Sequence, residues 1–244
     1  MIKKVEGIIV SEVDYKESSK IINILTKEDG LIGVLAKGAK KMKSQISSTS
    51  TKLTYANFHL NWFENRMPSL IEVDVIDKFK NIKKDLTKMS YSLFLLELSQ
   101  NVYKHENDNN IYNLLISSLK KIDENFDPEI ITNILELKLL EYLGIKPVID
   151  KCVICSSTKD IITISSYKGG YICKNCLNND NIVSPKTIKL IRMFYYVDIS
   201  RITKLEISES IKQEINNFID DYYERYSGLY LKSKIFLSEL KKVG

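Results

Sequence analysis

Residues 7–36 read GIIVSEVDYKESSKIINILTKEDGLIGVLA, and they decide the fold of the front of the chain. Apolar residues gather at residues 7–13, 20–26 and 31–36, and a Glu-Asp-Gly sequence at residues 28–30 separates the last two runs. Short apolar runs divided by turn-forming residues are typical of β-strands joined by tight turns. The stretch therefore predicts a β-meander.

Two later runs complete the predicted set of strands. Apolar and polar residues alternate over residues 58–62 and again over residues 71–75. A period of two predicts half-buried strands. Five strands, with no helical pattern long enough for a βαβ crossover, favour a five-stranded β-barrel of the OB type over residues 1–80. A small β-sandwich or an SH3-like barrel fits the same pattern.

The remainder of the chain, residues 81–244, has the periodicity of helices. Apolar residues recur every three or four positions over residues 82–98, which predicts one helix there, and again over residues 111–122. Two more helices have clear starts, because a capping residue precedes a proline at residues 127–128 and 184–185. The predicted fold class is α+β, an OB-fold domain followed by an α-helical domain.

Acidic residues in the N-terminal segment indicate the cellular compartment of the protein. Glu6, Glu12, Asp14 and Glu17 fall where a signal peptide would need an uninterrupted apolar stretch. No segment approaches the roughly 18 to 20 apolar residues that cross a bilayer. We therefore expect a soluble, cytoplasmic protein with no membrane partner. Disulfides are rare in that reducing compartment.

The four cysteines occur as two CxxC pairs with residues 156–172 between them: Cys152, Cys155, Cys173 and Cys176. Each CxxC turn can present two thiolates, and two such turns can surround one Zn²⁺ tetrahedrally. Residues 150–178 are therefore predicted to be a zinc-ribbon segment inserted in the helical domain. Two disulfides or four unrelated thiols are the alternatives. Four thiolates close the coordination shell, so the single zinc is expected to be structural.

Catalytic machinery is scarce in this sequence. His59 and His105 are the only histidines, so a Ser/His/Asp or Cys/His apparatus has almost nothing to be built from. The nine glycines form neither a GxxxxGK[ST] nor a GxGxxG motif. We expect a binding protein with no catalytic residues and no small-molecule substrate, rather than an enzyme.

A basic segment is the clearest binding feature. The formal net charge of the chain is +5, and residues 37–52 contain five lysines and no acidic residue: Lys37, Lys40, Lys41, Lys43 and Lys52. Lysines on a serine-rich segment can neutralise phosphates without reading the bases. We predict that these lysines bind nucleic acid; the alternative is a solvated segment that lysine keeps soluble.

Short motifs occur in a fixed order along nearly the whole chain. They are Gly7, Tyr15-Lys-Glu-Ser-Ser19, Leu25-Thr-Lys-Glu-Asp-Gly30, Ala36-Lys-Gly-Ala-Lys-Lys41, Leu143-Gly-Ile-Lys-Pro147, Cys152-Val-Ile-Cys155 and Gly228-Leu-Tyr-Leu-Lys-Ser233. Together with the order of barrel, helices, cysteine segment and helices, they make the chain resemble the RecO family of DNA recombination and repair proteins. Zinc ligands are not kept throughout that family, but all four are present here.

The resemblance implies binding of single- and double-stranded DNA and annealing of complementary strands. It also implies a place in the RecF pathway, where the protein acts with RecR and single-stranded DNA-binding protein so that RecA is loaded onto DNA. An alternative from another class is a zinc-ribbon adaptor of a transcription or ribosome-associated assembly. Strand annealing by the purified protein separates the two, because the adaptor should not accelerate it.

Overall fold

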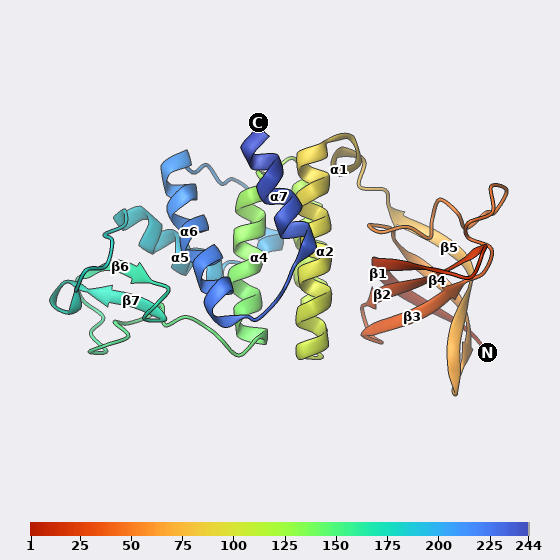
Figure 1. Ribbon diagram of the computed structural model, residues 1–244, viewed down its shortest axis with the longest axis horizontal. Coiled ribbons are helices and arrows are strands. Elements are labelled where there is room, and N and C mark those ends of the chain that lie inside the picture. Colours follow the sequence, from red (N-terminus) through yellow and green to blue (C-terminus); the bar gives the residue numbers. More distant parts are fainter. Residues whose placement is uncertain (244) are drawn as a thin grey trace. The chain divides into compact units, whose positions relative to one another are not determined.

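The computed structural model describes residues 1–243 of the chain, with side chains through residue 239. Figure 1 shows five strands that form a barrel, a set of helices and a separate two-stranded ribbon. The chain forms two compact units, Met1–Asn125 together with the segment from Leu231 onward, and Phe126–Tyr230. None of the helices described is long and apolar enough to cross a membrane.

The N-terminal strands close into a barrel in the order β1-β2-β3-β5-β4. Their bounds are β1 (Ile2–Tyr15), β2 (Ser19–Thr26), β3 (Leu31–Ala36), β4 (Tyr55–Phe63) and β5 (Arg66–Asp77). All pairs are antiparallel except β3 and β5, which are parallel and meet at Leu35 and Ser69. A closed barrel with this strand order is the predicted OB fold, and it excludes the sandwich as the alternative.

Alternation along the strands builds the interior of the barrel. Ile22 and Ile24 on β2 and Phe58 and Leu60 on β4 are completely buried, whereas the residues between them are partly exposed. These side chains pack with apolar residues from the other strands in one core. Because closure pairs every strand on both sides, the barrel leaves no long open edge.

Strand β5 departs from the predicted pattern. Leu70 is buried, but Ile71 is 48% and Val75 is 39% exposed, so they are not the half-buried residues that the alternation predicted. The pairing of β4 with β5 shifts register between His59 and Leu60 and again next to Tyr55. A β-bulge inserts an extra residue and re-aims the side chains beyond it, which explains why the period of two does not hold along β5.

The first unit also contains four helices: α1 (Lys80–Lys84), α2 (Leu86–His105), α3 (Asn110–Asp123) and α7 (Lys232–Val243). The prediction of one helix over residues 82–98 is wrong at its start, because Asp85 is extended and its carboxylate accepts a hydrogen bond from the Lys88 N–H. That N-cap ends α1 and begins α2. Farther along α2, Glu97 accepts N–H bonds from Lys232 and Ser233 and so holds the start of α7.

The second unit consists of helices and the ribbon. Its elements are α4 (Pro128–Tyr142), β6 (Ile161–Ser165), β7 (Gly170–Cys173), the 3₁₀ turns η1 (Lys174–Cys176) and η2 (Ile199–Arg201), α5 (Pro185–Tyr196) and α6 (Glu209–Tyr226). The predicted caps of α4 and α5 are confirmed, since Asp127 and Ser184 accept N–H bonds from the first turns. Helices α4, α5 and α6 pack together, and β6 lies against α5.

Candidate metal centre and nucleic-acid interface

The ribbon that carries the cysteines is a short hairpin joined to the strand-like residue Val148. Strands β6 and β7 are antiparallel, and Val148 pairs with Gly170 through the bond from the Tyr171 N–H to the Val148 carbonyl, 2.8 Å long. A Cβ atom on Gly170 would lie 2.2 Å from the Val148 carbonyl oxygen. Only glycine allows the two backbones to approach this closely.

The structure brings the four predicted metal ligands together. The sulfur atoms of Cys152, Cys155, Cys173 and Cys176 all lie within 4.8 Å of one another. Cys152 and Cys173 are buried, Cys176 is partly buried and Cys155 is exposed. In the part of the chain that the structure describes, this is the one group of histidine, cysteine or acidic side chains close enough to share an ion.

Backbone hydrogen bonds shape the first CxxC turn. The Cys152 N–H donates to Ser157 and the Ser156 N–H donates back to Cys152, with Ser156 in the left-handed conformation. Burial by itself raises the pKa of the Cys152 thiol, but N–H groups of Cys155, Cys173 and Ile154 point at its sulfur and lower that pKa to about 6. This turn is therefore built to stabilise a thiolate.

The Cys176 thiol of the second pair shows the opposite shift. A hydrogen bond shared with the Cys155 thiol, together with burial, raises the pKa of Cys176 to about 12. Four thiols this close cannot all carry negative charge unless a positive ion lies among them. A divalent cation bound by four sulfurs would supply that charge and release the protons.

The spacing of the sulfurs fits such an ion better than it fits disulfides. The Cys155 and Cys173 sulfurs are 3.6 Å apart, and all four cysteines are free. A tetrahedral ion with metal–sulfur distances of about 2.3 Å would hold its sulfurs about 3.8 Å apart. A disulfide needs about 2.05 Å. The four cysteines can thus hold one metal ion.

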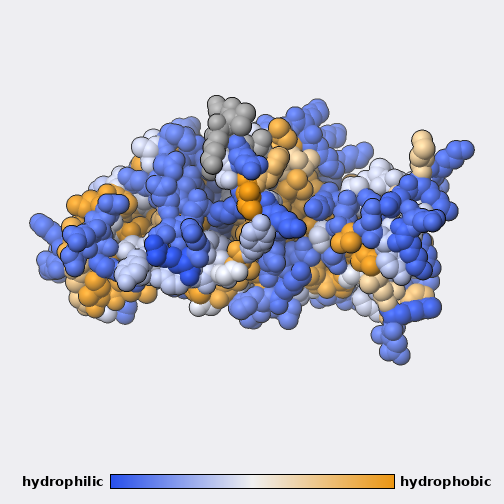
Figure 2. Space-filling view, in the orientation of Figure 1, coloured by the Kyte–Doolittle hydropathy of each residue, from blue (hydrophilic) through white to orange (hydrophobic). Residues whose placement is uncertain are grey.

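The predicted DNA-binding lysines lie on the segment that joins β3 to β4. All five, Lys37, Lys40, Lys41, Lys43 and Lys52, are exposed. Lys40 forms an ion pair with Asp14 at 2.7 Å, and its N–H donates to Ser18 in the turn between β1 and β2. The basic segment therefore lies beside that turn. Hydrophilic residues cover much of the visible surface of the molecule in this region (Figure 2).

Hydrogen-bonded turns hold the backbone of the basic segment. Bonds run from the Ser44 N–H to Lys41 and from the Ser50 N–H to Ile46, and the Leu53 N–H donates to Ile9 on β1. Leu53 is buried and Ile46 packs against the barrel core. These two apolar anchors, which the serine-rich sequence did not suggest, place the lysines on a defined surface of the barrel.

A polar contact between the barrel and α3 was not predicted from the sequence. The Glu6 carboxylate accepts hydrogen bonds from the hydroxyls of Tyr55, at 2.8 Å, and Tyr112, at 2.9 Å. Burial of Glu6 is outweighed by these bonds and by the charge of Lys27, so its pKa is lowered. The three residues are far apart in sequence, and no local spacing signals their contact.

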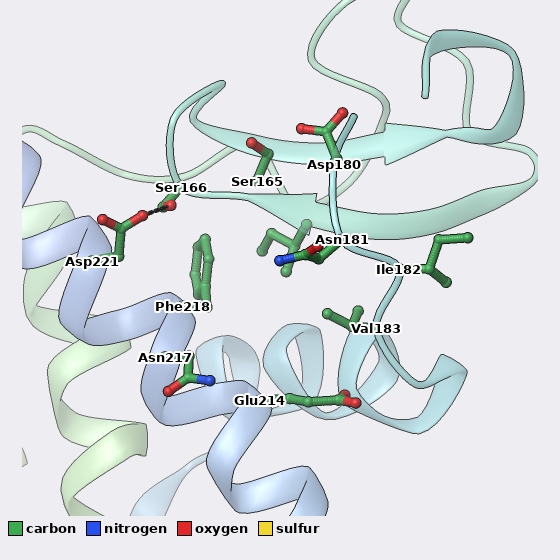
Figure 3. Close-up of a pocket in the computed structure, with 11 residues that line it drawn as sticks. Ser165, Ser166, Asp180, Asn181, Ile182, Val183, Glu214, Asn217, Phe218 and Asp221 are labelled. Atoms are coloured by element: carbon green, nitrogen blue, oxygen red, sulfur yellow. Dashed lines mark hydrogen bonds between the residues drawn. The ribbon is translucent and has the colours of Figure 1, made fainter. Parts of the chain in front are cut away.

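A cavity of about 320 Å³ in the second unit lies between the end of β6 and helix α6 (Figure 3). Three carboxylates line it, and each is already bonded within the protein. Asp221 accepts from Ser166 and Arg225, Glu214 accepts from the Ser184 N–H, and Asp180 pairs with Lys168 at 2.6 Å. Because its lining is acidic, this cavity would repel the phosphates of a nucleic acid.

Two family models cover most of the chain. The model described as "Recombination protein O N terminal" matches residues 1–79, and the model described as "Recombination protein O C terminal" matches residues 83–235. The boundary between the two matches lies where the barrel ends and α1 begins.

Curated relatives match over the full length. The DNA repair protein RecO of Bacillus pumilus and that of Bacillus subtilis are each 36% identical to this chain, covering 100% of it and 96% of the relative. The DNA repair protein RecO of Listeria innocua is 35% identical, over 98% of this chain and 95% of the relative. The chain therefore belongs to the RecO family, which gives it a role in DNA repair and recombination.

Proposed function

We propose that this protein binds single- and double-stranded DNA through the basic segment and thereby acts as a mediator of recombinational repair. The observation that carries the proposal is the set of five exposed lysines on one acid-free segment of an OB-fold barrel. OB-fold barrels commonly bind oligonucleotides on the face of their second and third strands and with the loops that join strands 1 to 2 and 4 to 5. The basic segment lies beside the first of these loops, because the Lys40 N–H donates to Ser18. The basic segment continues directly from the end of β3.

The lysines are suited to phosphates rather than to bases. An ammonium group on a long side chain neutralises a phosphate and releases counterions, which gives affinity without sequence preference. Lys40 already has Asp14 as a partner, so its net contribution should be smaller than that of Lys41. Sequence-independent binding is what a protein needs when it must act at any gap in the chromosome.

Family membership supports the further steps of the proposal. We infer that the protein anneals complementary strands and, with RecR, helps load RecA onto DNA coated by single-stranded DNA-binding protein. It does so in the cytoplasm, as a mediator without a catalytic site. Residues 1–80 form a separable OB-fold domain in this proposal, and residues 81–244 form the helical domain.

The metal of the cysteine centre is, in this proposal, one structural Zn²⁺. Four thiolates are the donor set that zinc and iron–sulfur centres use, and the CxxC spacing is that of zinc ribbons. When bound, the ion supplies a tetrahedral cross-link between the two CxxC turns. It leaves no coordination position for a water or a substrate, so its role is to hold the ribbon.

The test replaces Lys37, Lys40, Lys41 and Lys43 by alanine. DNA binding should weaken about equally for unrelated sequences. For each phosphate that the variant no longer neutralises, the slope of log K against log[salt] should flatten by about 0.9 on duplex and about 0.7 on single strands, hence by at most roughly 3 to 4 units. Fluorescence anisotropy with labelled oligonucleotides at several salt concentrations measures both quantities.

A matched control removes the same charge elsewhere. Lys78, Lys80, Lys83 and Lys84 are also exposed, but they lie in or just before α1. Their replacement by alanine should leave most of the slope intact. If both variants changed the slope equally, binding would follow net charge alone. If the wild type failed to accelerate annealing of complementary strands, the adaptor alternative would replace the mediator.

A further inference from the structure

The hairpin between β4 and β5 carries aromatic and cationic side chains outside the basic segment. It projects from the barrel near the N-terminus (Figure 1). A hollow of about 530 Å³ lies there, lined by Met1 and residues 62–66. These residues include an indole, a phenyl ring and a guanidinium group, which is an unusual concentration of flat side chains for one turn.

Two of these flat groups, Phe63 and Arg66, are already in contact. Phe63 and Arg66 face each other across the turn, and the guanidinium carbon of Arg66 lies 3.5 Å from the centre of the Phe63 ring. Lys3 places its ammonium group 4.5 Å from the centre of the Trp62 ring. Trp62 itself packs against the barrel core, which holds its ring in a fixed position next to Phe63.

This chemistry fits a nucleobase better than it fits a phosphate alone. Every base has a π-face, and such faces stack on aromatic rings and on the plane of an arginine without regard to sequence. Arg66 is exposed, so one face of its guanidinium remains available while the other covers Phe63. Arg66 attracts the neighbouring backbone, whereas Lys3 is paired with Asp29 and contributes less.

The hairpin lies close to the basic segment, because both are next to strand β3. Met67 of the hairpin lies beside Gly33 on β3, with its methyl carbon 3.7 Å from where a Cβ of Gly33 would be. Ala36, after which the basic segment begins, is only three residues farther along β3, or about 10 Å. One short single strand can therefore contact both.

We propose that the Phe63–Arg66 pair and the adjoining hollow are a base-stacking subsite for single-stranded DNA. The inference rests on the proposed DNA binding and adds a preference for single-stranded over double-stranded DNA. In a duplex both faces of each base are covered by its neighbours, whereas a single strand offers its bases freely. The subsite therefore favours single strands, while the lysines hold either form.

The test compares a thymidine oligonucleotide with an abasic oligonucleotide of equal length and charge. Wild-type protein should bind the thymidine strand about tenfold or more tightly, as expected when at least one base stacks. In the double variant Phe63→Leu and Arg66→Lys, which keeps the bulk and the charge, that ratio should fall toward one. The salt dependence should not change.

Two further variants make the result specific. The variant with Lys37, Lys40, Lys41 and Lys43 replaced by alanine should lose affinity for both strands and keep their ratio. Tyr167→Leu removes an exposed ring near the guanidinium of Arg225 in the second unit, and it should change nothing. Trp62 is the only tryptophan of the chain, so its fluorescence should respond to the thymidine strand and not to the abasic one.

The outcomes separate this inference from the proposed function. If wild-type protein bound both strands but the hairpin variant kept the wild-type ratio, the stacking subsite would be wrong and the lysine interface would stand. If wild-type protein bound neither strand, both proposals would fail together. Unchanged unfolding temperatures of the variants show that a lower ratio is not a folding defect.

Discussion

The barrel and the cysteine ribbon are both small β-structures, but different forces close them. The barrel has five paired strands around completely buried side chains such as Ile24 and Phe58. The ribbon has two short strands, and four cysteines gather at its end. A lone two-stranded hairpin is marginally stable in water. The proposed zinc would stabilise the ribbon through ligand bonds, where the barrel relies on burial.

Removal of the metal should produce the largest difference in stability between the ribbon and the barrel. In zinc-finger peptides the metal contributes roughly 10 to 16 kcal/mol, comparable with the whole stability of a domain. We expect Cys173→Ser to lose about one zinc per chain and to unfold the ribbon, while the barrel stays folded. Elemental analysis measures the metal, and hydrogen exchange reads the two regions separately.

The matched control for that change is Ser157→Ala, close to the cysteines but without a sulfur ligand. It should keep its zinc and its protected amides. If the barrel lost protection together with the ribbon in Cys173→Ser, the two structures would not be independent. A disulfide between Cys152 and Cys155 in reduced, metal-free protein would contradict the zinc proposal itself.

A large-to-small change in the barrel core should give the opposite pattern. Phe58 is completely buried, and Phe→Ala changes in cores cost about 3 to 5 kcal/mol. We expect Phe58→Ala to lower the urea midpoint of the first unit while zinc content stays at one. Ile71→Ala, on the same barrel but 48% exposed, should cost only about 0.5 kcal/mol. Equal losses of stability for the two variants would show that Phe58 is not part of the barrel core in solution.

Two neighbouring glycines test how tightly the ribbon is built. Gly169→Ala meets no atom within 4 Å, so only its left-handed conformation resists, at about 1 to 2 kcal/mol. Gly170→Ala brings a carbon against the Val148 backbone and should add about 1 to 3 kcal/mol of overpacking. The rate of zinc release to a chelator should therefore rise more in Gly170→Ala. The reverse order would mean that Val148 and β7 are not in contact in solution.

Much of this architecture could be predicted from residue patterns. The period of two located the strands, and proline after a capping residue located the starts of α4 and α5. The CxxC spacing predicted which four sulfurs would meet. Each of these signals is local, because it depends on residues a few positions apart.

Most of what the sequence did not reveal depends on contacts between distant segments, and one feature, the break between α1 and α2, was concealed by a competing local pattern. The bulges of β5 expose Ile71 and Val75, and they arise from pairing with β4. The break between α1 and α2 had a local signal in Asp85, but the continuous apolar spacing across it concealed the cap. The contact of Glu6 with Tyr112 joins residues that no periodicity relates.

Loss of the contact between Glu6 and Tyr112 should have the smallest expected effect on stability, and this effect should depend on pH. The tyrosine hydroxyls and Lys27 lower the pKa of Glu6 below its ordinary value of 4.5 in the folded protein, although burial opposes them. A carboxyl group whose pKa is lowered by folding stabilises the fold fully above its ordinary pKa, and it loses that contribution as the pH falls through the lowered value.

Replacement of this carboxylate by an amide, Glu6→Gln, should therefore cost stability at neutral pH and little in acid. Glu6 is partly exposed, and hydrogen bonds to a charged group contribute about 1.5 to 3 kcal/mol when well formed. Solvent screening should bring the loss at pH 7 to about 1 kcal/mol. The difference between variant and wild type should then shrink below pH 4.5, in urea titrations that follow the first unit. Glu72→Gln, on an exposed residue of β5, should show no such convergence. If the two variants lost stability equally at pH 7, the barrel and α3 would not be joined by this carboxylate, and the first unit would depend on apolar packing alone.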